Sequence, residues 1–242
     1  MVHEITIRKA NADRKLLDSK IEDIFENYLS RQLPLLTFYK RSKPIVRGKT
    51  PEEMENTIKS SWQQLNDLIR YRLILNDKVM MAYGGNIGDL NEDNLKVEVK
   101  YQFTSLDNFI EKPHYLTIAQ AIARKGYFHK IIDYCERMLI LVNNVISDYH
   151  KQTEINEKEI FSVLNSQFGP ESTASAKQRL EYEQAIRPGY ELVIINPLNI
   201  KDTITTAIEK MSWFVNEIDS LISNATETNT VSVDDSFEPK IV

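Results

Sequence analysis

The sequence is poor in cysteine and glycine and has no long apolar run. Its 242 residues include one cysteine, Cys135, so neither an internal disulfide framework nor a cysteine-based zinc cage can form. Seven glycines disfavour tight-turned β-barrels and glycine-rich phosphate loops. No stretch of about 18 apolar residues occurs, which predicts no membrane span, and the polar start predicts no signal peptide. We therefore expect a protein made and folded in the cytoplasm.

Charge is nearly balanced. The chain has 30 basic and 35 acidic residues, a net charge of −5, and 42% hydrophobic residues, as in an ordinary globular protein. The acidic balance argues against nucleic acid as a partner. A basic run over residues 40–49, beside Phe38 and Tyr39, could contact nucleic acid or an acidic surface, but a solvated loop is favoured because single-strand binders combine longer basic grooves with several aromatics.

Most of the sequence has the apolar periodicity of α-helices. A first helix is predicted over residues 5–33. A second begins at Thr50 and runs to about Met81, because Thr50, Pro51 and Glu53 form a capping-box pattern. Its inner stripe is predicted to be Met54, Ile58, Trp62, Leu65, Ile69 and Leu73. A second capping box, at Thr117 and Gln120, predicts the start of a third helix.

Two later segments carry apolar residues at alternating spacings of four and three, which is typical of a coiled-coil seam. The first seam contains Phe128, Ile132, Cys135, Leu139, Val142 and Ile146. The second contains Ile204, Ile208, Met211, Val215, Ile218 and Ile222. We expect a kink or boundary near Gly126 and a separate short helix over residues 157–168. Because long seams are hard to bury within one chain of this size, they predict a homo-oligomer.

Strands are predicted around residues 35–46, 95–103 and 190–195. The predicted fold class is mainly α, with long antiparallel helices in a bundle or coiled coil and a small β element. We expect one bundle domain over residues 1–224, with a β insertion around 83–115. Residues 225–242 are acidic and lack a period that could bury a face, which predicts a flexible tail.

The order of these segments, and above all the block Leu-Thr-Ile-Ala-Gln-Ala-Ile-Ala-Arg at residues 116–124, resembles the septicolysin-like family of bacterial and phage proteins. The final helix opening at Asn196-Pro197-Leu198 adds to this resemblance, which covers about two-thirds of the chain. The resemblance implies a helical, coiled-coil-containing and oligomeric protein.

Residues for chemistry are scarce. The four histidines have no metal-ligand spacing, and Cys135 within an apolar seam is predicted to be a buried thiol rather than a nucleophile. The glycines at 84, 85 and 88 precede an acidic segment that would repel phosphate, and that segment lacks the glycine and distal glutamate of an EF-hand. We therefore predict no catalytic residue, no cofactor and no metal.

The leading hypothesis is a non-enzymatic, self-associating structural or scaffold protein, with a phage or prophage virion assembled in the cytoplasm as the expected setting. Its partners would be further copies of itself and other virion proteins, and not a membrane. The alternative is a small-ligand or protein-binding module, such as a phage-encoded inhibitor or sponge, that uses the β element and the 83–115 loop. A hydrolytic enzyme is the weakest hypothesis.

Overall fold

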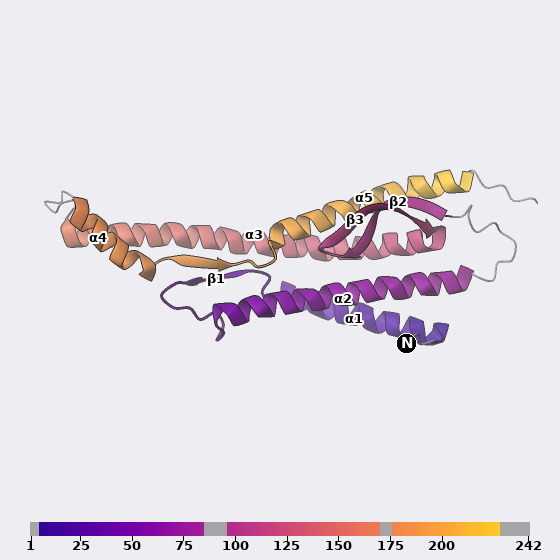
Figure 1. Cartoon of the computed structure of the whole chain (residues 1–242), viewed down its shortest axis with the longest axis horizontal. Coiled ribbons are helices and arrows are strands. Elements are labelled where there is room, and N and C mark those ends of the chain that lie inside the picture. Colours follow the sequence, from indigo (N-terminus) through magenta and orange to yellow (C-terminus); the bar gives the residue numbers. More distant parts are fainter. Residues whose placement is uncertain (1–4, 85–95, 170–175, 228–242) are drawn as a thin grey trace, which may run out of the picture. The chain divides into compact units, whose positions relative to one another are not determined.

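The computed structural model describes residues 5–84, 96–169 and 176–227, which form five α-helices, four strands and one short 3-10 helix (Figure 1). The prediction of a mainly α fold with a small β element is confirmed. In chain order the elements are α1 (Ile7–Leu29), β1 (Thr37–Lys40), α2 (Pro51–Gly84), β2 (Lys96–Ser105), β3 (Asn108–Thr117), α3 (Ile118–Phe168), α4 (Ala176–Ile186), η2 (Arg187–Gly189), β4 (Leu192–Ile195) and α5 (Ile200–Glu227).

The chain divides into two compact units. Unit 1 comprises residues 1–18, 69–133 and 207–242, and unit 2 comprises residues 19–68 and 134–206. Four helices, α1, α2, α3 and α5, contribute residues to both units. The last residues of α5 include 225–227 of the predicted tail, while residues 228–242 and 85–95 lie outside the described part of the chain.

Both predicted capping boxes are present. The Glu53 backbone N–H donates to Thr50 Oγ1 at 3.2 Å, and the Thr50 N–H donates to Glu53 Oε2 at 2.8 Å. At the start of α3 the Gln120 N–H donates to Thr117 Oγ1 at 3.2 Å, and the Thr117 N–H donates to Gln120 Oε1 at 2.8 Å. Each box satisfies two backbone donors that a helix start leaves without partners. The predicted inner stripe of α2, from Met54 to Leu73, is fully buried.

In unit 1 a β-hairpin packs on the helices through aromatic side chains. Strands β2 and β3 pair antiparallel, from Lys96 opposite Thr117 to Ser105 opposite Asn108. Phe103 of β2 lies 5.0 Å from Phe128 of α3, measured between ring centroids, and Phe128 lies 5.1 Å from Phe214 of α5. This chain of rings joins the hairpin to both helices.

On the α1–α2 side of unit 1, polar contacts join the helices. Arg72 of α2 donates through Nε to Asp18 Oδ1 of α1 at 2.9 Å, and its guanidinium lies 4.0 Å from the centre of the Tyr127 ring of α3. Arg14 of α1 donates to Asn76 Oδ1 of α2 at 3.0 Å. These contacts help to fix α1 beside α2 within the unit.

Unit 2 contains the second sheet and its own core. Strands β1 and β4 pair antiparallel, with Thr37 opposite Ile195 and Lys40 opposite Leu192. A buried cluster of Val46, Met54, Ile58 and Ile195 includes the last residue of β4, and Tyr39 of β1 packs against it. Phe25 of α1 stacks on Tyr134 of α3 with ring centroids 4.5 Å apart.

Two predicted boundaries in the third helix are wrong. The helix α3 is continuous from Ile118 to Phe168, so Gly126 is no boundary and residues 157–168 form no separate helix. A glycine inside a helix costs only about 1 kcal/mol relative to alanine, and packing against the rest of the protein offsets that cost.

The second strand of the hairpin, β3, was predicted only as part of the 83–115 loop. Pro113 interrupts its apolar pattern, and β3 pairs with β2 alone among the described strands. Proline lacks a backbone N–H and is therefore tolerated on an edge strand, where one side needs no partner. The predicted β insertion is thus a two-stranded hairpin.

Candidate functional site

The predicted seam on α3 is buried at every second position. Phe128, Cys135 and Val142 are buried, whereas Ile132, Leu139 and Ile146 are half-buried. The neighbouring Ile131, in unit 1, and Met138, in unit 2, are 1% and 0% exposed. From Phe128 to Val142 the buried residues are therefore spaced three, four, three and four apart, whereas the predicted seam is spaced four, three, four and three apart. A role of the seam in oligomer contacts stays a prediction.

Most residues of the predicted seam on α5 are buried. Ile204, Met211, Val215 and Ile218 are buried, and Ile208 and Ile222 are half-buried. Ala207 and Phe214 are also buried, which widens the inner face beyond a two-position seam. Most of this seam is therefore already used by the fold of a single chain.

An apolar groove lies between the beginning of α1 and the second half of α2, within unit 1. It has a volume of about 290 Å³. On α2 its lining combines exposed Tyr71, Ile74 and Lys78 with Leu75 and Val79, which are buried. The lining residues are Ile5, Ile7, Ala10, Tyr71, Ile74, Leu75, Lys78, Val79 and Ala82.

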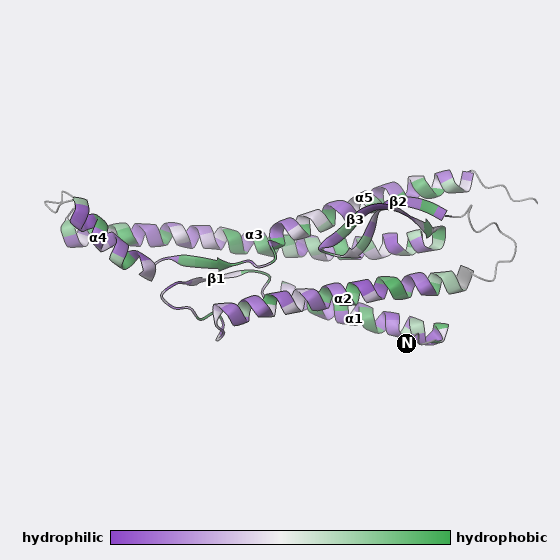
Figure 2. Ribbon diagram, in the orientation of Figure 1, coloured by the Kyte–Doolittle hydropathy of each residue, from purple (hydrophilic) through white to green (hydrophobic). Residues whose placement is uncertain are grey.

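Several side chains of this groove are exposed. Ile7 is 40% exposed, Tyr71 53% and Ile74 43%. Figure 2 shows apolar residues interleaved with polar ones along α1 and α2. Scattered apolar residues are normal on protein surfaces, but a groove that gathers several of them is a feature of interaction sites.

The charges at this groove are positive. Lys78 is part of its lining, and Arg8 and Lys9 follow Ile7 on exposed positions of the first turn of α1. That turn contains no acidic residue. The N-terminal end of a helix also carries a partial positive charge, so this end of the groove favours an acidic segment.

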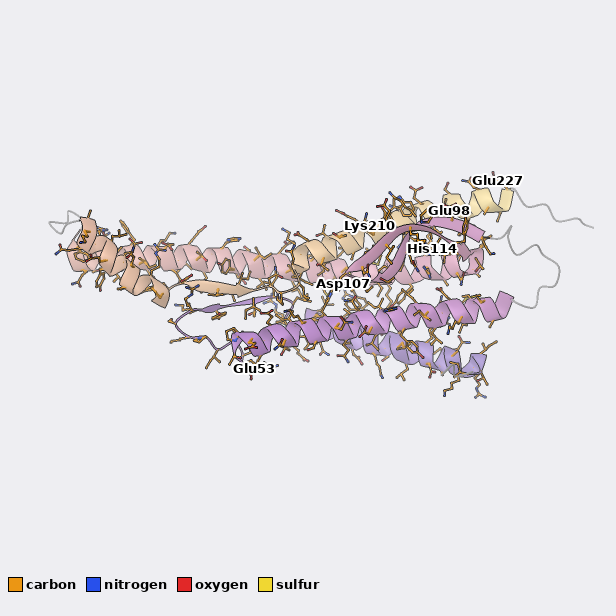
Figure 3. The ribbon with its side chains drawn as sticks, in the orientation of Figure 1. Glu53, Glu98, Asp107, His114, Lys210 and Glu227 are labelled. Carbon is orange, nitrogen blue, oxygen red and sulfur yellow. The ribbon has the colours of Figure 1, made fainter. Side chains whose placement is uncertain are left out.

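A second, polar hollow of unit 1 lies beside the hairpin and has a volume of about 220 Å³. Its lining comes from α2, β2, β3 and the beginning of α3. The residues are Arg70, Leu73, Ile74, Asp77, Gln102, Phe103, Thr104, His114 and Arg124. Figure 3 shows His114 on the hairpin.

An ion pair with a histidine is the polar centre of this hollow. Arg124 donates through Nε to Asp77 Oδ1 at 3.3 Å and through Nη2 to Oδ2 at 2.5 Å. The third nitrogen, Nη1, lies 3.5 Å from His114 Nε2. Burial, followed by the Arg124 charge, lowers the pKa of His114 below its ordinary value of 6.5, so the neutral imidazole is favoured.

Sequence reasoning did not single out this hollow. Of its polar residues only His114 was considered, as an ordinary surface or core histidine. Arg70 and Asp77 are two helical turns apart on one face of α2, a spacing that is visible in the sequence. Their meeting with His114 and Arg124 depends on how the hairpin packs on the helices.

Cys135 is buried, as predicted from its position in an apolar seam. It is 0% exposed, and burial raises the pKa of its thiol to about 12. A protonated, covered thiol cannot act as a nucleophile toward substrate in the folded protein. Over the described residues there is no group of three or more histidine, cysteine or acidic side chains that could hold a metal ion.

The glycine and acidic residues at 85–93, which were weighed as phosphate and calcium loops, lie outside the described residues. None of the described helices has the length and apolar character needed to cross a membrane. No family model, curated protein or solved structure matches the chain. The candidate sites therefore stand on their geometry alone.

Proposed function

We propose that the protein is a non-enzymatic structural protein that associates with further copies of itself through the apolar groove between α1 and α2. The observation that carries this proposal is the open groove, with exposed Ile7, Tyr71 and Ile74 and a basic border. An apolar groove with one sign of charge at its edge favours a segment that combines apolar and oppositely charged residues.

The chain itself contains a segment of that chemistry. Residues 228–242 combine apolar Val231, Val233 and Phe237 with acidic Asp234 and Asp235. We take this segment, from a second copy, as the occupant of the groove. Apolar side chains would cover the exposed isoleucines and Tyr71, while the carboxylates would lie near the basic first turn of α1.

A direct pairing of two identical grooves is less favourable. Lys78, Arg8 and Lys9 of both copies would then lie in one interface, and an accumulation of charges of one sign disfavours association. An exchange of tails has no such repulsion. Because the groove and the tail are different surfaces, this contact is heterologous and can close into a ring or continue as a filament.

Light scattering on purified protein tests the proposal. The full chain should have a mass that is a multiple of 28.1 kDa, and a chain that ends at Glu227 should have the mass of one copy. The variant Tyr71→Asp should also dissociate, because an aspartate in the groove loses apolar area and adds an unpaired charge. Ile45→Asp is the matched control, since Ile45 is an exposed apolar residue of unit 2, 68% exposed and absent from the groove lining.

A synthetic peptide of residues 228–242 adds a second test. It should compete with the tails and reduce the mass of the full-length assembly. A full chain that has the mass of one copy up to high concentration would overturn self-association, as would an assembly that keeps its mass without residues 228–242. Equal effects of Tyr71→Asp and Ile45→Asp would remove the groove from the proposal. Circular dichroism checks that each variant is folded.

The setting that we propose is a phage or prophage virion assembled in the cytoplasm, where further virion proteins are the additional partners. The resemblance of residues 116–124 to the septicolysin-like family of bacterial and phage proteins motivates it. Mass spectrometry of purified virions would test this setting directly.

A second candidate function is favoured by the polar hollow. A small-ligand-binding module that uses the β element would need a concave site with a few polar groups, and the hollow beside β2 and β3 has this character. Self-association and ligand binding do not exclude each other, because the groove and the hollow share only Ile74.

A further inference from the structure

The polar hollow of unit 1 carries an excess of positive charge. Its lining includes two guanidinium groups, Arg70 and Arg124, against one carboxylate, Asp77. His114 adds no charge in its favoured neutral form. One cation of the hollow is therefore left without a counterion from its own lining.

That cation is Arg70. Asp77 is already held by Arg124 through two hydrogen bonds, at 3.3 and 2.5 Å. Arg70 is exposed, and within the described part of the chain its guanidinium has no acidic partner. A guanidinium presents paired N–H donors in a plane, which match the two oxygens of a carboxylate.

Arg124 offers a second donor whose position is fixed. Only 10% of its side chain is exposed, and the bidentate contact with Asp77 holds the guanidinium plane. Its Nη1 group is not used by Asp77 and lies 3.5 Å from the His114 ring, at the long limit of a hydrogen bond. A donor held in this way loses little conformational entropy when a ligand binds.

The rest of the lining limits the size and character of a ligand. Leu73, Ile74 and Phe103 are apolar, and Gln102 and Thr104 are polar. The volume of about 220 Å³ is below the range of about 300–1,000 Å³ that is typical of sites for drug-sized molecules. The hollow therefore suits a small molecule with one charged end and a short apolar body.

We propose that this hollow binds the carboxylate group of a small organic acid, with Arg70 as the mobile cation and Arg124 as the fixed second donor. The apolar body of the acid lies against Leu73, Ile74 and Phe103. This site does not depend on self-association, because its polar residues take no part in the α1–α2 groove.

Titrations of the full-length protein with benzoate and acetate, followed by the NMR signals of the arginine Nε–H groups, test the proposal. Benzamide and acetamide are the uncharged counterparts of these probes. Saturable shifts of the Arg70 and Arg124 signals are expected with the acids and not with the amides. Replacing Arg70 with glutamine should weaken benzoate binding about tenfold or more, the loss expected for a charge-assisted contact.

Arg41→Gln is the matched control. Arg41 is also an exposed arginine, and it lies outside both the hollow and the groove, so its variant should bind benzoate like the unchanged protein. The mass measured by light scattering should stay the same with and without benzoate, which separates this test from that of self-association.

Three outcomes would overturn the proposal. The first is the absence of saturable shifts with both acids. The second is an equal loss of binding in Arg70→Gln and Arg41→Gln, which would indicate general attraction of anions to a basic surface. The third is a tighter binding of inorganic phosphate than of either acid at the same two arginines, which would assign the hollow to phosphate chemistry.

Discussion

Two adjacent isoleucines of α3, Ile131 and Ile132, provide a sharp test of which face of this helix forms the core of unit 1. Ile131 is 1% exposed, and Ile132 is half-buried. Replacing either residue with alanine removes the same atoms and changes helix propensity by the same amount. A difference between the two variants therefore reports burial and packing at each position.

The expected magnitudes follow from the burial of each side chain. At Ile131 the lost transfer free energy is about 2.4 kcal/mol, from about 0.8 kcal/mol for each buried carbon group that is removed. The cavity that is left behind raises the total cost to about 3–4 kcal/mol. At Ile132 solvent can reach the vacated space, so the expected cost is about 1–1.5 kcal/mol. The two variants should differ by about 2 kcal/mol.

Urea unfolding followed by the fluorescence of Trp213 measures this difference, because Trp213 belongs to the same unit as both isoleucines. Trp62 belongs to unit 2 and would be replaced by phenylalanine in every variant, so that a single tryptophan reports. The measurement is repeated over a range of protein concentrations. Equal losses at low concentration would refute the reasoning. A loss in Ile132→Ala that grows with concentration would instead support the predicted oligomer seam at that residue.

Three further predictions concern single groups. Burial and Arg124 lower the pKa of His114 in the folded protein, so the unfolded chain binds a proton first as the pH falls. The free energy of unfolding should therefore decrease below about pH 6.5. Unfolding by urea at several pH values should show a weaker decrease in His114→Gln. Thr50→Ala should reduce the free energy of unfolding by about 1 kcal/mol, since it removes one half of the capping box of α2, whereas Thr50→Ser should retain most of the stability. Cys135 should react with a thiol reagent such as DTNB only after unfolding, because its thiol is buried and the pKa of the thiol is raised to about 12. Rapid reaction of the folded protein would contradict the burial of this side chain.

Sequence reasoning was most successful where the cause of a structure is local. Thr50 with Glu53, and Thr117 with Gln120, form capping boxes through contacts only three residues apart. Stripes such as the one from Met54 to Leu73 also follow from the helical period, because only one orientation of the helix can bury them together. The helical fold class and the starts of two long helices were therefore predictable.

The inner face of α3 was harder to predict because two apolar residues are adjacent at several turns. Ile131 and Ile132, and likewise Met138 and Leu139, fit seams that differ by one residue. The helical period alone is compatible with either of the two seams. In the folded protein Ile131 and Met138 are the buried pair, 1% and 0% exposed, because the neighbouring elements pack against that side of the helix.

The polar hollow depends still more on tertiary structure. The spacing of Arg70 and Asp77 on one face of α2 is present in the sequence. His114, however, lies on β3, which was not predicted because Pro113 interrupts its apolar pattern, and Arg124 lies on the next helix. The sequence by itself determined where α2 and α3 begin and which stripe of α2 is buried, because these follow from contacts within a few residues and from the helical period. Only the tertiary structure decided that two arginines, an aspartate and a neutral histidine line one hollow, because that requires the hairpin to pack against α2 and α3.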